Sequence, residues 1–119
     1  MKMHESAENY LETILVLSRV QKRVRSVDIA NELKFSKASV CVALKRLREN
    51  GYAEVDSEGH IFLTETGKEI AGKIYERHSL LSDWLISIGV DKKTAAEDAC
   101  RIEHVISQET IEKLKNTMK

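Results

Sequence analysis

The sequence has no proline, only 5% aromatic residues and two cysteines in 119 residues. Because proline interrupts helices, its absence favours long, unbroken helices. Cys41 and Cys100 lie far apart in the chain and indicate free thiols rather than a disulfide framework. No apolar run approaches the ~20 residues that span a bilayer, and the N-terminus lacks the apolar core of a signal peptide. We therefore expect a small cytoplasmic protein with no membrane partner.

The sequence also lacks a net charge, but its charges are unevenly distributed. Residues 19–48 contain nine Lys and Arg against two Asp and Glu, a local balance of +7, which leaves −7 for the remainder. A segregated basic segment is typical of a surface that binds the phosphates of a nucleic acid. The alternative is a solvated basic surface with no partner.

This basic segment has the pattern of a helix-turn-helix. Ser26 reads as the N-cap of a short helix over 27–34, Phe35 and Ser36 break the pattern, and a second helix follows over 37–50 before Gly51. In such motifs the start of the second helix contacts bases in the major groove, and basic residues further along contact phosphates. The predicted DNA-binding residues are Ser36, Lys37, Ala38, Ser39, Val42, Lys45 and Arg46.

After Gly51 the hydrophobic pattern changes to a period of two. Residues 52–56 and 60–63 predict two short strands around a glycine-containing turn, which is a β-hairpin. A hairpin directly after the second helix is the wing of a winged helix-turn-helix. We expect His60, near the tip, to lie beside solvent or phosphate rather than to bind a metal.

The C-terminal half predicts three further helices. The first begins at the cap Thr64 and ends near Ser87, the second is capped by Asp91, and the third by Ser107. In the second of these, Cys100, Glu103 and His104 fall at positions i, i+3 and i+4 and share one helix face. A thiol, a carboxylate and an imidazole form a ligand set for a transition metal. A solvated polar face is the other reading of this spacing.

Two stretches of the sequence resemble the DtxR/MntR family of metal-dependent repressors. They are Glu-Arg-His-Ser-Leu-Leu at 76–81 and Glu-Asp-Ala-Cys-Arg-Ile-Glu-His-Val-Ile-Ser at 97–107, and Asn-Tyr-Leu-Glu-Thr-Ile at 9–14 is similar to the family's first helix. The resemblance implies a mainly α fold, with a winged helix-turn-helix DNA-binding domain over 1–70 and a helical metal-binding and dimerisation domain over 71–119. It also implies a homodimeric transcriptional repressor that controls metal-ion homeostasis and binds a double-stranded DNA operator.

The same resemblance implies a ligand set. It assigns metal ligation to His78, Cys100, Glu103 and His104, with Glu12 and Asn9 from the first helix. Cys100 is the choice of the iron branch of the family, whereas Glu12 matches the manganese branch. Ala96 stands where the iron branch has a ligand of an ancillary site and cannot itself ligate. The expected metal is Fe(II), with Mn(II) second, and Zn(II) or Co(II) could bind in vitro.

Two other classes of protein are alternatives to a metal-dependent repressor. A metal-independent winged-helix regulator would share residues 36–48 and use the polar residues of 100–104 as surface. A metallo-hydrolase would need an open coordination position and a separate acid/base pair, which the sequence does not offer, so no enzyme is expected. For the dimer contact, the last two helices offer an apolar set: Ile102, Val105, Ile106, Ile111 and Leu114.

Overall fold

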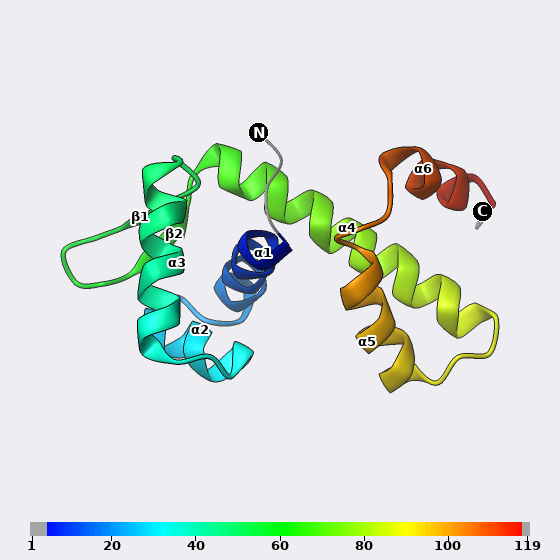
Figure 1. Ribbon diagram of the computed structural model, residues 1–119, viewed down its shortest axis with the longest axis horizontal. Coiled ribbons are helices and arrows are strands. Elements are labelled where there is room, and N and C mark those ends of the chain that lie inside the picture. Colours follow the sequence, from blue (N-terminus) through cyan, green and yellow to red (C-terminus); the bar gives the residue numbers. More distant parts are fainter. Residues whose placement is uncertain (1–4, 118–119) are drawn as a thin grey trace. The chain divides into compact units, whose positions relative to one another are not determined.

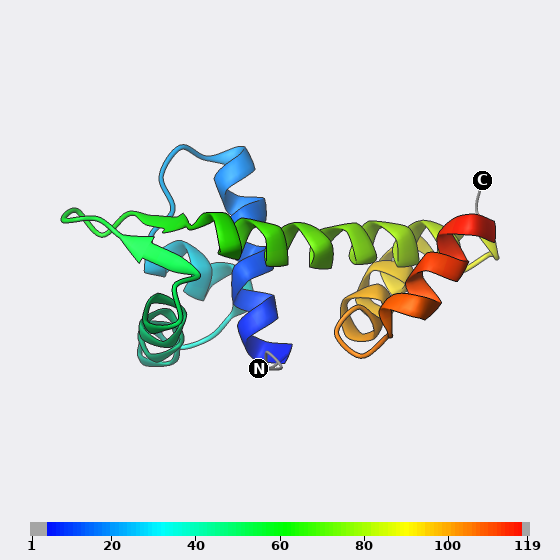
Figure 2. The ribbon, with the colours of Figure 1, turned by 90° about the horizontal axis from the view of Figure 1, so that it is seen from above.

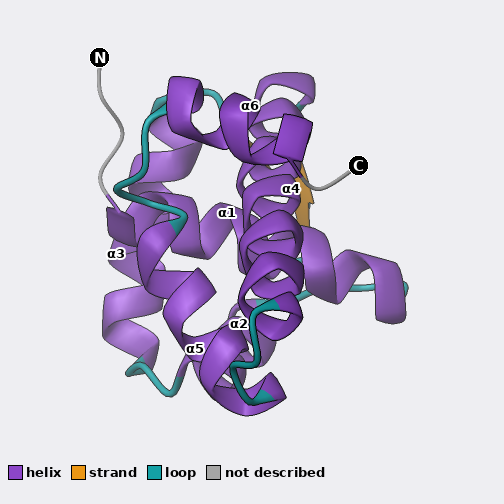
Figure 3. Ribbon diagram, turned by 90° about the vertical axis from the view of Figure 1, so that its right-hand side faces the viewer, coloured by secondary structure: helices purple, strands orange, loops and turns teal. Residues whose placement is uncertain are grey.

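The computed structural model describes residues 5–117, which fold into two units divided between Gly72 and Lys73. The elements in chain order are α1 (Glu5–Val20), α2 (Ser26–Leu33), α3 (Lys37–Glu49), β1 (Ala53–Val55), β2 (Ile61–Leu63), α4 (Glu65–Ser87), α5 (Lys92–Ile102) and α6 (Gln108–Thr117). Helices dominate the described chain (Figures 1 and 3). The mainly α class and the winged helix-turn-helix are therefore confirmed. Among the described residues, no helix is both long and apolar enough to cross a membrane.

Helices α2 and α3 form the helix-turn-helix, joined by residues 34–36 (Figure 1). Lys34 ends α2 in the left-handed conformation, with φ of 58°. Ser36 then caps α3, because its Oγ accepts a hydrogen bond from the backbone N–H of Ser39 at 3.1 Å. The expected cap of α2 was wrong. Ser26 lies inside the helix, and Arg25 is the N-cap residue, with its N–H bonded to Asp28 Oδ2 at 2.9 Å.

The core of the N-terminal unit is built from the apolar faces of these helices. Leu11 and Ile14 of α1, Ile29 of α2 and Val40 of α3 are all at most 1% exposed. Within a helix, apolar residues that are three or four positions apart, such as Leu11 and Ile14, lie on one face. Burying these faces together leaves the opposite face of α3 to solvent.

The wing is an antiparallel hairpin in which Ala53 pairs with Leu63 and Val55 with Ile61. Figure 2 shows the hairpin leading directly into α4. Thr64 caps that helix as predicted, since its Oγ1 accepts from the N–H of Gly67 at 3.1 Å. A side chain at Gly67 would overlap the carbonyl oxygen of Tyr52, so this junction requires glycine.

The C-terminal unit contains α5, α6 and the part of α4 from Lys73 onwards. Its core consists of Leu81, Ala99 and Ile111, with Leu80, Ile102, Ile106 and Leu114 packed against them. Ile111 was expected to contribute to a dimer surface, but it is 2% exposed and packs inside its own unit. Val105, at 75% exposure, is the member of that apolar set that is open to solvent.

Helix α5 is shorter than the sequence predicts. It begins after the cap Asp91, as expected, but ends at Ile102, with Glu103 as its C-cap. The N–H groups of Val105 and Ile106 both turn back to the carbonyl of Ile102, at 3.0 Å each. After this turn, Ser107 caps α6 by accepting from the N–H of Thr110 at 3.1 Å.

Candidate metal centre

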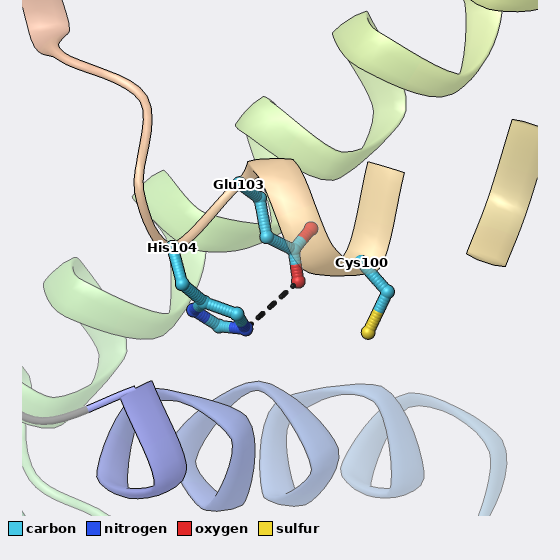
Figure 4. Close-up of side chains that lie close together, drawn as sticks. All are labelled: Cys100, Glu103 and His104. Atoms are coloured by element: carbon cyan, nitrogen blue, oxygen red, sulfur yellow. Dashed lines mark ion pairs between the residues drawn. The ribbon is translucent and has the colours of Figure 1, made fainter. Parts of the chain in front are cut away.

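The C-terminal end of α5 brings together three side chains suited to bind a metal. Ligand atoms of Cys100, Glu103 and His104 lie within 4.8 Å of one another. Figure 4 shows the thiol, the carboxylate and the imidazole converging on one side of the helix end. His104 lies one residue beyond the C-cap rather than on a continuous helix, yet the turn keeps its Nε2 3.3 Å from Glu103 Oε1. The predicted triplet therefore converges although the predicted helix does not extend through it.

His78 reaches the same carboxylate from α4. Its Nδ1 lies 3.0 Å from Oε2 of Glu103, so the two oxygens of Glu103 face two different imidazoles. An ionised carboxylate can only accept hydrogen bonds, and an N–H on Nδ1 of His78 would donate to it. The same two atoms, Nδ1 and Oε2, could instead bind a cation.

The carboxylate of Glu103 is fully buried, with 0% of its side chain exposed. No hydrogen bond from a described residue reaches its Oε1. A buried carboxylate whose Oε1 accepts no hydrogen bond is costly unless a positive charge compensates it. A carboxylate, imidazoles and a thiol are together the donor types that Fe(II), Mn(II), Co(II) and Zn(II) accept. The residues present fit a divalent transition metal.

The remaining two predicted ligands belong to the N-terminal unit. Asn9 and Glu12 are partly buried and lie three residues apart on α1, so they share a face of that helix. Their ligation stays a prediction. Asn9 can offer only a neutral carbonyl oxygen, which is a weaker ligand than the carboxylate of Glu12.

The wing contains a second group of potential ligands: Asp56, Glu58 and His60. His60 was expected to lie beside solvent or phosphate, but it is only 5% exposed. Nη2 of Arg25, which can only donate, lies 3.2 Å from Nε2 of His60, so that nitrogen is the acceptor. The proton of the neutral ring is then on Nδ1, 3.1 Å from Asp56 Oδ2. With both nitrogens engaged, this histidine ties the wing to the start of α2 and is not arranged to bind a metal.

The predicted DNA-binding residues all lie on the open side of α3. Ser36, Lys37, Ala38, Ser39, Val42, Lys45 and Arg46 are exposed, whereas Val40, Leu44 and Leu47 of the same helix are buried. Val42 is apolar and still 55% exposed. The surface offered to a partner is thus small and hydroxylated at the start of the helix and basic further along.

One residue beside the candidate centre carried no signal in the sequence. Arg77 precedes His78 on α4, and its guanidinium donates to the carbonyl oxygens of Glu103 at 3.2 Å and Ile106 at 3.1 Å. Both acceptors are backbone atoms, and a pattern of residue types does not reveal which side chain will bind them.

The sequence matches two family descriptions that together cover nearly all of the chain. Residues 2–61 match "Iron dependent repressor, N-terminal DNA binding domain", and residues 64–119 match "Iron dependent repressor, metal binding and dimerisation domain". The chain is 36% identical to an uncharacterized HTH-type transcriptional regulator of Methanocaldococcus jannaschii, over 95% of this chain and 92% of that protein. It is 35% identical to the transcriptional regulator MntR of Escherichia coli O6:H1, over 91% of this chain and 70% of MntR.

Solved structures agree with this relationship. The manganese regulator SloR superposes with a TM-score of 0.84 and 25% identity over 94% of this chain, which spans about half (53%) of the SloR chain. A hypothetical protein of Sulfolobus solfataricus superposes with a TM-score of 0.72 and 27% identity, over 98% of this chain and 89% of that protein. This chain belongs to the iron-dependent repressor, or DtxR/MntR, family of metal-dependent transcriptional repressors.

Proposed function

We propose that this protein is a homodimeric repressor whose affinity for its operator rises when a divalent metal binds at Cys100, Glu103 and His104. The observation that carries the proposal is the buried carboxylate of Glu103, which faces an imidazole with each oxygen and has a thiol nearby. Family membership supports the same role. Because DNA is the partner, we place the protein in the cytoplasm, and the relatives' description as regulators favours a protein without enzymatic activity.

Each side chain of the centre has a distinct part in this proposal. Glu103 supplies the charged oxygen donor, His78 and His104 supply nitrogen donors from α4 and from the turn after α5, and Cys100 supplies sulfur. A bound metal would provide positive charge that compensates the buried carboxylate and a deprotonated thiol. From the family resemblance, Glu12 is predicted to add a further carboxylate and Asn9 a carbonyl oxygen.

The donor set favours Fe(II) first and Mn(II) second. Oxygen and nitrogen donors suit both ions, and the sulfur of Cys100 shifts preference towards Fe(II), Co(II) or Zn(II). The structural neighbour SloR is a manganese regulator by name, which keeps Mn(II) as a serious candidate.

The DNA contacts follow from the exposed face of α3. We propose that residues 36–39 and Val42 face the bases, and that Lys45 and Arg46 contact phosphates. A homodimer would present two such helices to half-sites about 34–36 Å apart. A metal that favours the DNA-competent arrangement by ~1–3 kcal/mol would change the affinity roughly 5- to 150-fold. The division into DNA binding by residues 1–70 and metal binding and dimerisation by 71–119 belongs to this proposal.

Equilibrium dialysis of Fe(II) and Mn(II) under anaerobic conditions tests the centre directly. Glu103→Gln keeps the size of the side chain but removes its charge, and we expect it to abolish tight binding of both ions. Glu97→Gln is the matched control, since Glu97 is an exposed carboxylate on the same helix. Unchanged metal binding by Glu103→Gln, in protein whose helicity equals that of the wild type, would refute the site. The metal-independent regulator would then be the better account.

A further inference from the structure

The guanidinium of Arg77, on α4, is hydrogen-bonded to the turn between α5 and α6. One nitrogen, Nη1, donates to the carbonyl oxygens of Glu103 and Ile106, at 3.2 and 3.1 Å. The other, Nη2, donates to Oε1 of Gln108, the first residue of α6, at 2.9 Å. A single guanidinium therefore binds the end of α5, the turn and the start of α6.

This arrangement uses the particular shape of arginine. The guanidinium is planar and offers five N–H donors in a fixed fork, whereas lysine offers a point charge on a flexible stem. The last carbonyls of a helix have no partner within the helix and carry partial negative charge, so a cation there is favourable. Arg77 satisfies the carbonyl of Glu103, the C-cap of α5, and a second backbone carbonyl in the turn, that of Ile106.

Arg77 and His78 are consecutive on α4 and bind the same residue in two ways. His78 contacts the carboxylate of Glu103 at 3.0 Å, while Arg77 holds its backbone carbonyl at 3.2 Å. Glu103 is thus fixed relative to α4 through both its carboxylate and its backbone carbonyl. Because His104 follows Glu103 in the held turn, its imidazole is positioned by the same contacts.

We infer that Arg77 is a positioning residue for the metal centre, holding Glu103 and His104 in the arrangement that receives the ion. The inference rests on the proposed function for its metal-binding part. Groups that orient metal ligands without touching the metal typically contribute about 10- to 100-fold to affinity. Arg77 would act in this way through the backbone of the turn, whereas His78 contacts the carboxylate directly.

The test compares Arg77→Lys and Arg77→Gln with Arg101→Gln in the full-length protein. Arg101 is the matched control because it lies in the same unit, is 72% exposed and pairs with Asp98 on the surface. Co(II) serves as the probe, since its visible absorption reports the geometry of its ligands, and its Kd is measured by titration. In metal-free protein, amide hydrogen exchange at Val105 and Ile106 reports whether the turn is held.

We expect both Arg77 variants to weaken Co(II) binding by at least about tenfold, to alter its absorption spectrum and to accelerate exchange at Val105 and Ile106. Arg101→Gln should leave all three unchanged. Restoration of the wild-type Kd by Arg77→Lys would show that charge alone matters and would overturn the positioning role. So would a normal Kd and spectrum in both Arg77 variants accompanied only by a lower urea midpoint, which is the result of a purely structural role.

The two proposals fail in different ways in this experiment. If the wild-type protein does not bind Co(II), the proposed function is overturned and the metal-directed role of Arg77 with it. If the wild type binds Co(II) and the Arg77 variants bind it equally well, the metal centre stands and only the role of Arg77 is refuted.

Discussion

Nδ1 of His78 on α4 lies 3.0 Å from Oε2 of Glu103 at the end of α5, and this carboxylate is inaccessible to solvent. The pair joins two helices through a polar contact in a unit whose apolar core is built on Leu81, Ala99 and Ile111. Buried polar contacts of this kind add little stability compared with well-packed apolar residues. Their presence here is better explained by a function in binding a cation.

Replacing the sulfur ligand should change which metal the protein prefers. We expect Cys100→Ser to weaken Co(II) and Zn(II) binding by at least about tenfold, or 1.4 kcal/mol, and Mn(II) binding by much less, because manganese favours oxygen and nitrogen donors. Competition titrations with a metal-binding dye would measure the three constants. Cys41→Ser, an exposed thiol on α3, is the control and should change none of them. Equal losses for all three ions in Cys100→Ser would contradict a role of sulfur in selectivity.

The contacts of His60 should stabilise the DNA-binding unit. His60→Ala removes the acceptor for Arg25 and the donor for Asp56, and we expect the free energy of unfolding to fall by about 1–3 kcal/mol. Urea denaturation followed by circular dichroism measures the change. Glu58→Ala alters an exposed side chain of the same turn and should change stability far less. A His60→Ala variant as stable as Glu58→Ala would show that the buried ring contributes no net stability.

The wing should also lose stability in acid through Asp56. The backbone N–H of His60 donates to its carboxylate and holds the pKa of Asp56 below its usual value, helped by the N–H of Glu58 and by the His60 ring. A depressed folded-state pKa contributes stability that is present above the unfolded value of about 3.9. That stability is lost as the pH falls through the lower folded value.

We therefore expect the urea midpoint of the wild type to fall more steeply below about pH 5 than that of Asp56→Asn, which has no charge to lose. Glu54→Gln, an exposed position on β1, should follow the wild-type curve. Parallel curves for the wild type and Asp56→Asn would contradict the inferred contribution.

Much of the fold could be predicted because local chemistry determines it. The predicted caps Thr64, Asp91 and Ser107 lie where their residue types predict, and each accepts a backbone hydrogen bond there. The alternation around 52–63 likewise predicts the hairpin. These features depend on residues that are neighbours in the chain.

The errors arose where distant residues decide the structure. The spacing of Cys100, Glu103 and His104 correctly predicted that they converge, but a periodic pattern does not show that a turn, bound by Arg77 and followed by the Ser107 cap, replaces the helix after Ile102. His60 looked like a polar residue at a turn, and only the fold reveals that it is buried and bound to Arg25, 35 residues away. Ile111 was assigned to the dimer contact because the sequence of an apolar helix face does not tell whether that face packs inside its own unit or against a second subunit.

The proposed phosphate contact of Lys45 can be tested by the salt dependence of binding. Lys45→Ala should weaken binding to specific and non-specific duplexes alike and reduce the slope of log Kd against log salt by about one. Lys93→Ala removes the same charge from an exposed position on α5 and should leave the slope unchanged. A loss confined to one base pair of the operator would instead assign Lys45 to base recognition.

The measurement that tests the central claim most directly is fluorescence anisotropy of a labelled duplex taken from upstream of the protein's own gene. Titrations are run anaerobically without metal and with Fe(II), Mn(II) or Zn(II), for the wild type and for Glu103→Gln. We expect Fe(II) or Mn(II) to tighten binding of the wild type about tenfold or more, and Glu103→Gln to bind equally weakly in all four conditions. Equal affinity of the wild type with and without metal would contradict the account and leave a winged-helix regulator whose residues 100–104 are only a polar helix end.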